Sequence, residues 1–329
     1  MIELDQNINA LKAYRCPVSK SELSYENDFL NSNLGHHYPV LSEYKKLVPA
    51  FSFQDEDVNE YSIDKAAEIH DNALAWLLKV HHTNEDQFRN EILTNLRLRK
   101  GQRVLITGVG AGNDLPYICP QIGETGEIFA QDYSKQMLFA AIKRSDQLFN
   151  LQDYNINYSL GDAVSLPFPS EFFDVVYHFG GINLFSSISK GVLEMERVVK
   201  SGGRVVFGDE GLAPWLKQEE LGKILIRNNP LYKYDLPLDS LPSSATDVSV
   251  NWTINNCYYV VSYTSSKKEL PVNLDLPHSG SRGGSLRTRY YGLLEGINPD
   301  LKNKIYIAAK SKGVSRVEFL ENLLTNSLK

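Results

Sequence analysis

A glycine-rich loop between a predicted strand and a predicted helix is the strongest chemical signal in this 329-residue chain. The run Val104-Leu-Ile-Thr-Gly-Val-Gly-Ala-Gly-Asn-Asp-Leu115 places Gly108, Gly110 and Gly112 at alternate positions. Glycine permits a sharp turn and lets a ligand approach the backbone without meeting a Cβ atom. The spacing differs from the GxGxxG of dinucleotide-binding loops, because Asn113 stands where that pattern has its third glycine. The loop alone therefore predicts a ligand site without identifying the ligand.

An acidic residue at the next predicted strand end supports this site. Asp132 lies 20 residues after Gly112, at the end of the second predicted strand. Open α/β sheets bind ligands at the carboxyl ends of their strands, where one carboxylate can accept hydrogen bonds from both hydroxyls of a ribose. The alternative is that Asp132 only caps its own loop. Asp114 is expected to cap the helix that follows the glycine loop.

Titratable and aromatic residues near the later strand ends are candidates for catalysis. His178 is the last residue of the fourth predicted strand, and a histidine has a pKa suited to removing a proton from an acceptor. The alternative role for His178 is a wall residue or a cofactor contact. Asp209 and Glu210 follow the fifth strand and could act as bases or as loop caps. Tyr133 and Tyr177 could offer ring faces to a base or a cation, although Tyr177 could instead face the core.

Strands and helices alternate in the middle of the chain, which is typical of a doubly wound parallel sheet. Two further strands, separated by Asn255-Asn256, predict a terminal antiparallel hairpin. The predicted fold class is therefore α/β, with a mostly parallel seven-stranded sheet. Ser134 is expected to cap the second helix. The predicted strands are 103–107, 127–131, 155–159, 174–178, 204–208, 248–254 and 257–263, and the helices between them include 135–147 and 191–199.

The chain divides into four predicted regions. Residues 1–50 form a small irregular unit, 51–99 a helical linker, 100–268 the sheet domain, and 269–329 a loop followed by two amphipathic helices. Asn298 and Ser315 are the predicted N-caps of those two helices. The apolar residues expected to be buried are Leu301, Ile305 and Ala308 in the first helix, and Phe319, Leu320, Leu323 and Leu324 in the second.

Charge and composition favour a cytoplasmic protein that acts on a small molecule. The formal net charge is −6, which argues against a nucleic-acid partner, since phosphate neutralisation supplies most of that affinity. Residues 266–329 nevertheless carry 11 basic against 6 acidic side chains, either as a solvated surface or to dock an anionic partner. No apolar run approaches the ~20 residues of a membrane span. The N-terminus lacks the order of a signal peptide, and three scattered cysteines predict no disulfide framework.

Four ordered motifs resemble class I, Rossmann-like S-adenosylmethionine-dependent methyltransferases. Besides the glycine loop and Asp132, they are Gly161-Asp-Ala-Val-Ser-Leu-Pro-Phe-Pro with Phe172-Phe-Asp-Val-Val-Tyr, and Glu194-Met-Glu-Arg-Val-Val-Lys-Ser-Gly-Gly-Arg-Val-Val-Phe. The resemblance is to the small-molecule branch that contains the ubiquinone/menaquinone C-methyltransferases. It implies S-adenosylmethionine as the methyl donor and S-adenosylhomocysteine as the product. The implied acceptor is an apolar or aromatic small molecule, with or without an acid group.

The resemblance also implies roles for individual residues. Asp162 would accept from the exocyclic amine of adenine, and the N–H of Ala163 would face a ring nitrogen. The family often has an acidic residue two positions before the first glycine to hold the methionine amino group, but Ile106 stands there. Carbonyl groups near Gly108, or the side chain of Asp114, would then anchor that group. The implied cofactor-binding set is Gly108, Gly110, Gly112, Asp114, Asp132, Tyr133, Met137, Asp162 and Ala163.

The predicted catalytic residue is His178, and the predicted acceptor contacts are Asp209, Glu210 and Arg287. Arg287 lies in the loop Arg282-Gly-Gly-Ser-Leu-Arg-Thr-Arg289, whose three arginines could clamp a carboxylate or phosphate on the acceptor. The alternative is a solvated loop that ties the last helices to the core.

The N-terminal region resembles a degenerate zinc ribbon of some rRNA-guanine methyltransferases. Zinc needs four nitrogen or sulfur donors in a structural site, so a metal-free relic that packs on the catalytic domain is predicted. His36 and His37 are the alternative donors. The four aligned ligand positions hold Cys16, Ser19, Asn31 and Leu34.

Two other functions remain open from the sequence. An RNA methyltransferase is suggested by the zinc-ribbon relic and the basic tail. The fourth strand is not followed by the Asn/Asp-Pro-Pro-Tyr/Phe run of enzymes that methylate base amino groups, which favours a small molecule. A binding module without turnover is suggested by Ile106.

Overall fold

The structure is a computed structural model that describes residues 8–52, 61, 63, 65–281, 283–291 and 296–328. Two compact units divide the chain, Met1–Glu269 and Leu270–Lys329, and each unit is described by itself. No helix among these residues is long and apolar enough to cross a membrane.

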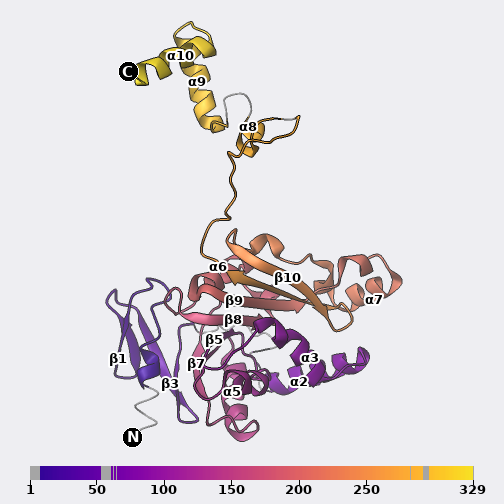
Figure 1. The fold of residues 1–329 in the computed structure, drawn as a ribbon. Helices are drawn as coiled ribbons and strands as arrows, with labels where there is room; N and C mark the ends of the chain where they lie inside the picture. Colours follow the sequence, from indigo (N-terminus) through magenta and orange to yellow (C-terminus); the bar gives the residue numbers. More distant parts are fainter. Residues whose placement is uncertain are drawn as a thin grey trace. The chain divides into compact units, whose positions relative to one another are not determined.

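A seven-stranded sheet forms the centre of the first unit (Figure 1). Its strands are β5 (Arg103–Thr107), β6 (Glu127–Asp132), β7 (Asn155–Leu160), β8 (Phe173–Phe179), β9 (Val199–Glu210), β10 (Ala245–Thr253) and β11 (Tyr258–Ser265). Their order is β10-β11-β9-β8-β5-β6-β7. Neighbours among β9, β8, β5, β6 and β7 pair in parallel. Strand β11 pairs antiparallel with β9, and β10 pairs antiparallel with β11. The predicted α/β sheet with a terminal hairpin is therefore confirmed.

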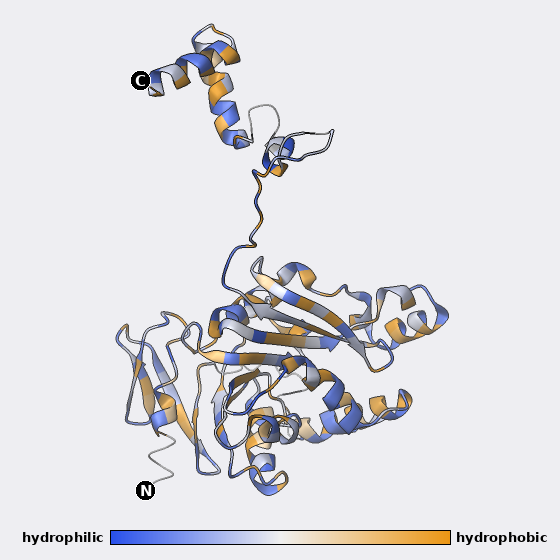
Figure 2. Cartoon of the chain, viewed as in Figure 1, coloured by the Kyte–Doolittle hydropathy of each residue, from blue (hydrophilic) through white to orange (hydrophobic). Residues whose placement is uncertain are grey.

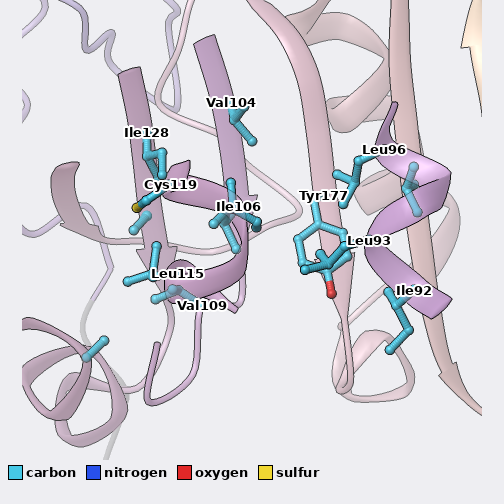
Figure 3. Close-up of a cluster of buried hydrophobic side chains, with 14 of the residues drawn as sticks. Ile92, Leu93, Leu96, Val104, Ile106, Val109, Leu115, Cys119, Ile128 and Tyr177 are labelled. Atoms are coloured by element: carbon cyan, nitrogen blue, oxygen red, sulfur yellow. The ribbon is translucent and has the colours of Figure 1, made fainter. Parts of the chain in front are cut away.

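Helices cover both faces of this sheet. On one face, α3 (Glu85–Leu93), α4 (Leu115–Ile122) and α5 (Lys135–Gln147) pack their apolar residues against the strands. Figure 3 shows part of this core, with Ile92, Leu93 and Leu96 beside Tyr177. The other face is covered by α6 (Ile188–Val198) and by the N-terminal residues. Before α3, α2 (Ala66–Val80) contacts α5.

The N-terminal residues form a four-stranded antiparallel sheet rather than the irregular unit that was predicted. Two-residue turns join β1 to β2 and β3 to β4, and both residues of each turn have positive φ angles, although none is a glycine. The sequence therefore carried no Asn-Gly or Asp-Gly signal for these hairpins. This sheet stands beside β7, because the Phe51 N–H donates to the Leu160 carbonyl at 2.8 Å (Figure 1). Its strands are β1 (Leu23–Glu26), β2 (Phe29–Ser32), β3 (His37–Glu43) and β4 (Lys46–Pro49).

Short helical turns link the remaining elements of the first unit. Among them, α7 (Glu220–Asn228) lies between β9 and the terminal hairpin. The hairpin turn spans 254–257 rather than the two asparagines predicted, and Ile254, Asn255 and Asn256 all have positive φ. The 3-10 turns are η1 (Thr94–Leu96), η2 (Ile182–Leu184), η3 (Pro214–Leu216), η4 (Pro230–Lys233) and η5 (Leu238–Ser240).

The second unit contains α8 (Leu286–Tyr291), α9 (Pro299–Ser311) and α10 (Arg316–Ser327). Asn298 and Ser315 cap α9 and α10 as predicted, because their side chains accept from backbone N–H groups of the first turn. Figure 2 shows hydrophilic and hydrophobic residues alternating along both helices. The prediction of which residues of α9 and α10 are buried was partly wrong. Ile305 and Ala309 are buried in α9, whereas Leu301 is half exposed, and α10 buries none of Phe319, Leu320, Leu323 and Leu324.

Candidate functional site

The glycine loop turns sharply at the carboxyl end of β5. Gly108, Gly110 and Gly112 have φ angles of +79°, +57° and +82°, which favour glycine. A Cβ on Gly108 would lie 2.8 Å from Cε1 of His178, and one on Gly112 would lie 3.1 Å from Cβ of Ala141 in α5. The first and third glycines therefore allow β8 and α5 to approach the loop closely.

Asp132 holds the glycine loop against the start of α5. Its carboxylate accepts from the N–H of Gly110 at 2.7 Å and from the N–H of Ser134 at 2.8 Å. Ser134 in turn caps α5, as predicted, by accepting from the N–H of Met137. Burial raises the pKa of the Asp132 carboxyl to about 6, against the backbone hydrogen bonds, which lower it. Each carboxylate oxygen has a second acceptor position, so Asp132 retains capacity for ligand hydroxyls.

Asp162 and Ala163 stand at the end of β7, the strand next to β6. The N–H of Gly161 donates to the Asp132 carbonyl at 3.0 Å, which brings the two predicted binding residues onto neighbouring loops. Asp162 is half buried and accepts from the N–H of Val164 at 3.0 Å, while Ala163 is buried. The structure therefore places both residues at the carboxyl edge of the sheet beside Asp132.

Tyr133 and Met137 occupy different environments near this edge. Tyr133 is 43% exposed at the start of the loop after β6. Met137 is buried in a small apolar cluster with Ala66 and Ala111, so α2 covers the side of the glycine loop that Met137 lines.

His178 lies under the glycine loop and is only 2% exposed. Its Nδ1–H donates to the Thr107 carbonyl at 2.5 Å, and its ring meets the Phe185 ring edge-on at 4.7 Å between centroids. Burial lowers the His178 pKa to about 4, although the hydrogen bond to Thr107 raises it. The imidazole is therefore neutral near pH 7, with Nε2 as the remaining acceptor.

A row of buried polar side chains extends from His178 across the sheet. Thr107, Gln131 and Ser159 are register partners on β5, β6 and β7. Within the described part of the chain, His178 Nε2, the Thr107 hydroxyl, both polar atoms of the Gln131 amide and the Ser159 hydroxyl lack protein partners. Such buried groups normally bind water or a ligand. No local sequence pattern predicts this row, because it forms only when the strands align.

Asp209 and Glu210 differ in what they bind at the end of β9. The Asp209 carboxylate accepts from the N–H groups of Gly181 and Asn183, at 3.2 and 3.0 Å, and so holds the turn after β8. Burial raises its pKa to about 6. Glu210 accepts from the Tyr258 hydroxyl at 2.7 Å and from the side-chain amide of Asn229. Asp209 is thus committed to its loop, whereas Glu210 binds the side chains of Asn229, after α7, and Tyr258, on β11.

Asp114 does not cap α4 with its side chain, so this prediction was wrong. Its carboxylate is instead drawn to the buried guanidinium of Arg89 in α3, which donates to it at 2.8 Å, and it also accepts from the Tyr177 hydroxyl at 3.0 Å. Tyr177 is buried, so its ring faces the core rather than a ligand. Arg89 was missed, because its only signal in the sequence was the i,i+4 pair with Glu85.

The comparisons do not support the predicted resemblance of the N-terminal region to a degenerate zinc ribbon, which stays a prediction. The side-chain oxygen of Asn31 accepts from Nδ1–H of His37 at 2.6 Å, and Leu34 is 65% exposed. Cys16 instead contacts His36 Nδ1 at 3.6 Å and the Tyr38 hydroxyl at 3.1 Å. Among the described residues, no three His, Cys, Asp or Glu side chains are grouped to hold a metal ion.

Arg287 belongs to the second unit, where its guanidinium donates to Asp275 at 2.8 Å. Arg289 donates to the Gly283 carbonyl, and Arg282 lies outside the described residues. The acceptor clamp therefore stays a prediction.

The comparisons with known proteins agree with this geometry. Residues 105–207 match a family model described as a methyltransferase domain. The ubiquinone/menaquinone biosynthesis C-methyltransferase UbiE of Coxiella burnetii is 35% identical over 158 residues, covering 43% of this chain and 61% of the relative. UbiE of Francisella philomiragia is 29% identical over 161 residues, covering 45% and 63%. A putative S-adenosylmethionine-dependent methyltransferase from Methanococcus maripaludis aligns with a TM-score of 0.48 and 19% identity, over 66% of this chain and 99% of that one.

The chain spans less than two thirds of the length of these curated relatives. The matched segment begins in β5 and ends in β9, so it contains the glycine loop, Asp132, Asp162 and His178. Together with the sheet order, this match identifies residues 105–207 as a class I, Rossmann-like S-adenosylmethionine-dependent methyltransferase domain that resembles the UbiE C-methyltransferases.

Proposed function

We propose that this chain transfers the methyl group of S-adenosylmethionine to a small-molecule acceptor. The observation that carries the proposal is the double hydrogen bond of Asp132, which joins the glycine loop after β5 to the start of α5. These hydrogen bonds hold the Asp132 carboxylate at the point where two parallel strands end. Open α/β sheets bind nucleotide-type ligands at this edge.

The residues at this edge fit S-adenosylmethionine. Asp132 would accept from the ribose hydroxyls, and the half-buried Asp162 would accept from the adenine amine. The unpartnered His178 Nε2 and the Gln131 amide offer further polar groups beneath the loop. When bound, the cofactor supplies an electrophilic methyl group on a sulfonium. The contribution of the chain is alignment and exclusion of water, and alignment alone can lower a barrier by ~7–11 kcal/mol.

The acceptor would lie beyond the carboxyl ends of β8 and β9. The rings of Phe88, Phe179 and Tyr258 contact one another there, with centroids 5.6 to 6.3 Å apart. Glu210 accepts from the Tyr258 hydroxyl beside them. Phe179 is partly exposed at the end of β8, and an aromatic ring beside one carboxylate suits an apolar or aromatic acceptor that loses a proton. The name of the UbiE relatives, which refers to ubiquinone and menaquinone, points the same way.

His178 is poorly suited to the role of general base, because it is buried under the glycine loop. A base works best when its pKa lies near the working pH, and the His178 pKa is about 4. We therefore assign His178 the second of its two predicted roles, as a residue that positions the Thr107–Gly108 peptide and lines the cofactor site.

Calorimetry with S-adenosylhomocysteine, followed by transfer of labelled methyl to quinol and phenol acceptors, tests the proposal. Micromolar binding that Asp132→Ala weakens, together with labelled product, would support it. Absence of binding at millimolar ligand would refute both the cofactor site and the activity. Binding without transfer to any acceptor would instead favour the module without turnover.

A further inference from the structure

The loop that joins β7 to β8 is tied at both ends to the N-terminal segment (residues 8–52). The Phe51 N–H, which follows β4, donates at 2.8 Å to the carbonyl of Leu160, the last residue of β7. Further along the loop, the Pro167 carbonyl accepts from the Arg15 N–H at 2.9 Å. The chain between these two hydrogen bonds contains the carboxylate that the proposed function assigns to the adenine amine.

Two side-chain contacts hold the middle of this loop. The Ser165 hydroxyl donates to the Pro17 carbonyl at 3.0 Å. The Lys20 ammonium donates to the Leu166 carbonyl at 3.3 Å and pairs with Glu194 of α6 at 3.0 Å. The same Glu194 oxygen accepts from the Leu166 N–H at 2.8 Å. The N–H and the carbonyl of Leu166 are thus both held by one ion pair, whose side chains are 36% and 16% exposed.

Arg197 holds the same loop from the side of α6. Its guanidinium donates to both carboxylate oxygens of Glu194, at 2.7 and 2.8 Å. It also donates to the Leu166 and Phe168 carbonyls, at 3.0 and 2.7 Å. Glu194 therefore keeps its position without Lys20. Removing Lys20 would release the loop on its N-terminal side and leave it attached on the other.

The direction of the Asp162 carboxylate depends on where this loop lies. Its Oδ1 accepts from the Val164 N–H at 3.0 Å, and its carbonyl accepts from the Ser165 N–H at 3.1 Å. The carboxylate is thus part of a tight turn that ends at Ser165, the residue tied to Pro17. A displacement of Ser165 would move the carboxylate with it. Hydrogen bonds weaken steeply when their distance or angle departs from the optimum, so such a displacement would be felt at the adenine amine.

We propose that the N-terminal segment sets the selectivity of the cofactor site for adenine, with Lys20 and Ser165 as positioning residues. Both act through the loop, and neither touches the cofactor. The inference rests on the proposed function. It gives a role to residues 8–52, which lie outside the segment that matches the methyltransferase family and were predicted only as a relic that packs on the catalytic domain.

Two ligands that differ at the adenine amine test the inference. S-Inosylhomocysteine carries a carbonyl oxygen where S-adenosylhomocysteine carries this amine. The unaltered chain should bind S-adenosylhomocysteine at least about tenfold more tightly, because a site that pairs with an N–H group rejects a ligand that lacks it. Lys20→Met combined with Ser165→Ala should reduce this ratio at least about threefold, through weaker binding of S-adenosylhomocysteine. Calorimetry on the full chain measures the Kd of both ligands.

Lys200→Met is the matched control. Lys200 also forms a partly exposed ion pair, 2.6 Å from Asp174, but this pair joins the first residues of β8 and β9 at the opposite edge of the sheet. Its loss should leave the ratio of the two Kd values unchanged. Asp162→Ala is the reference for complete loss of selectivity and should bring the ratio close to one.

The combined variant decides between selectivity and simple bracing. If it weakens both ligands by the same factor, or weakens neither, the N-terminal segment only braces the fold and the inference is wrong. If the unaltered chain binds both ligands equally, the loop does not recognise the adenine amine, and the inference is wrong although the cofactor site stands. If the unaltered chain binds neither ligand, the proposed function itself fails, so the failures are distinguishable.

Discussion

At the scale of single residues, the ionisation of Asp132 should make cofactor affinity depend on pH. Burial raises its pKa to about 6, and hydroxyl donors of a bound ribose would favour the ionised form. Affinity for S-adenosylhomocysteine should therefore be constant above about pH 7 and fall as the pH drops through 6, by up to about tenfold per unit. Calorimetry between pH 5 and 8 measures this. Asp132→Asn should bind about tenfold or more weakly at pH 8 and lose the dependence, whereas an unchanged slope in this variant would assign the titration elsewhere.

Variants of His178 should show whether this residue positions the cofactor loop or transfers a proton. Its Nδ1–H holds the Thr107 carbonyl and its ring packs under Gly108, so His178→Ala should raise the KM for the cofactor about tenfold. The kcat at saturating cofactor should fall less than about tenfold, because loss of a general base would lower it ~10²–10⁴-fold. His178→Asn, which keeps a donor for Thr107, should recover part of the KM. A large fall in kcat with an unchanged KM would make His178 the base after all.

The glycine loop and the acidic residue at the end of β6 could be located from the sequence, whereas contacts that join distant elements could not. Gly108 and Asp132 were recognisable from their residue types and their spacing. The contact between Arg89 and Asp114 depends on how α3 packs against α4, and no local pattern encodes that. Asp114 was therefore given a local role as a helix cap, and a distant guanidinium bound it instead.

At the scale of elements, a side chain added at Gly112 should lower the free energy of unfolding, because the glycine loop packs closely against α5. An alanine there would place Cβ 3.1 Å from Ala141, at a φ of +82°. Gly202 has nearly the same φ, +79°, but nothing lies within 4 Å of the added Cβ. Gly202→Ala should therefore cost only the backbone strain, roughly 1–2 kcal/mol, and Gly112→Ala about 1–3 kcal/mol more. Urea unfolding measures both. Equal losses would show that α5 moves away from the loop at little cost.

The strands of the large sheet were predictable because each is a short apolar run between turn residues. The hairpin of β3 and β4 was not, since Tyr44 and Lys45 adopt positive φ without the residues that usually signal such turns. The face of α10 was misassigned for a different reason. Helical periodicity indicates which residues share a face, but not whether any partner covers that face, and α10 has no buried residue.

At the scale of the whole molecule, the cofactor site should be independent of the second unit. Every predicted cofactor residue and all three apolar core clusters lie within Met1–Glu269. A chain ending at Glu269 should therefore bind S-adenosylhomocysteine within about twofold of the full chain, and its main melting transition should be unchanged. Calorimetry and differential scanning calorimetry test both statements. Loss of binding in the shortened chain would mean that the second unit contributes to the site.

The same shortened chain also tests the predicted role of Arg287. If this arginine clamps an acid group on the acceptor, removing residues 270–329 should raise the KM for the acceptor about tenfold and leave cofactor affinity intact. Arg287→Ala in the full chain is the matched variant and should give the same split, because it removes the guanidinium and spares α9 and α10. Asp275→Asn, which removes the carboxylate that pairs with Arg287, should not raise that KM. An acceptor KM that is unchanged in both the shortened chain and Arg287→Ala would exclude Arg287 from acceptor binding.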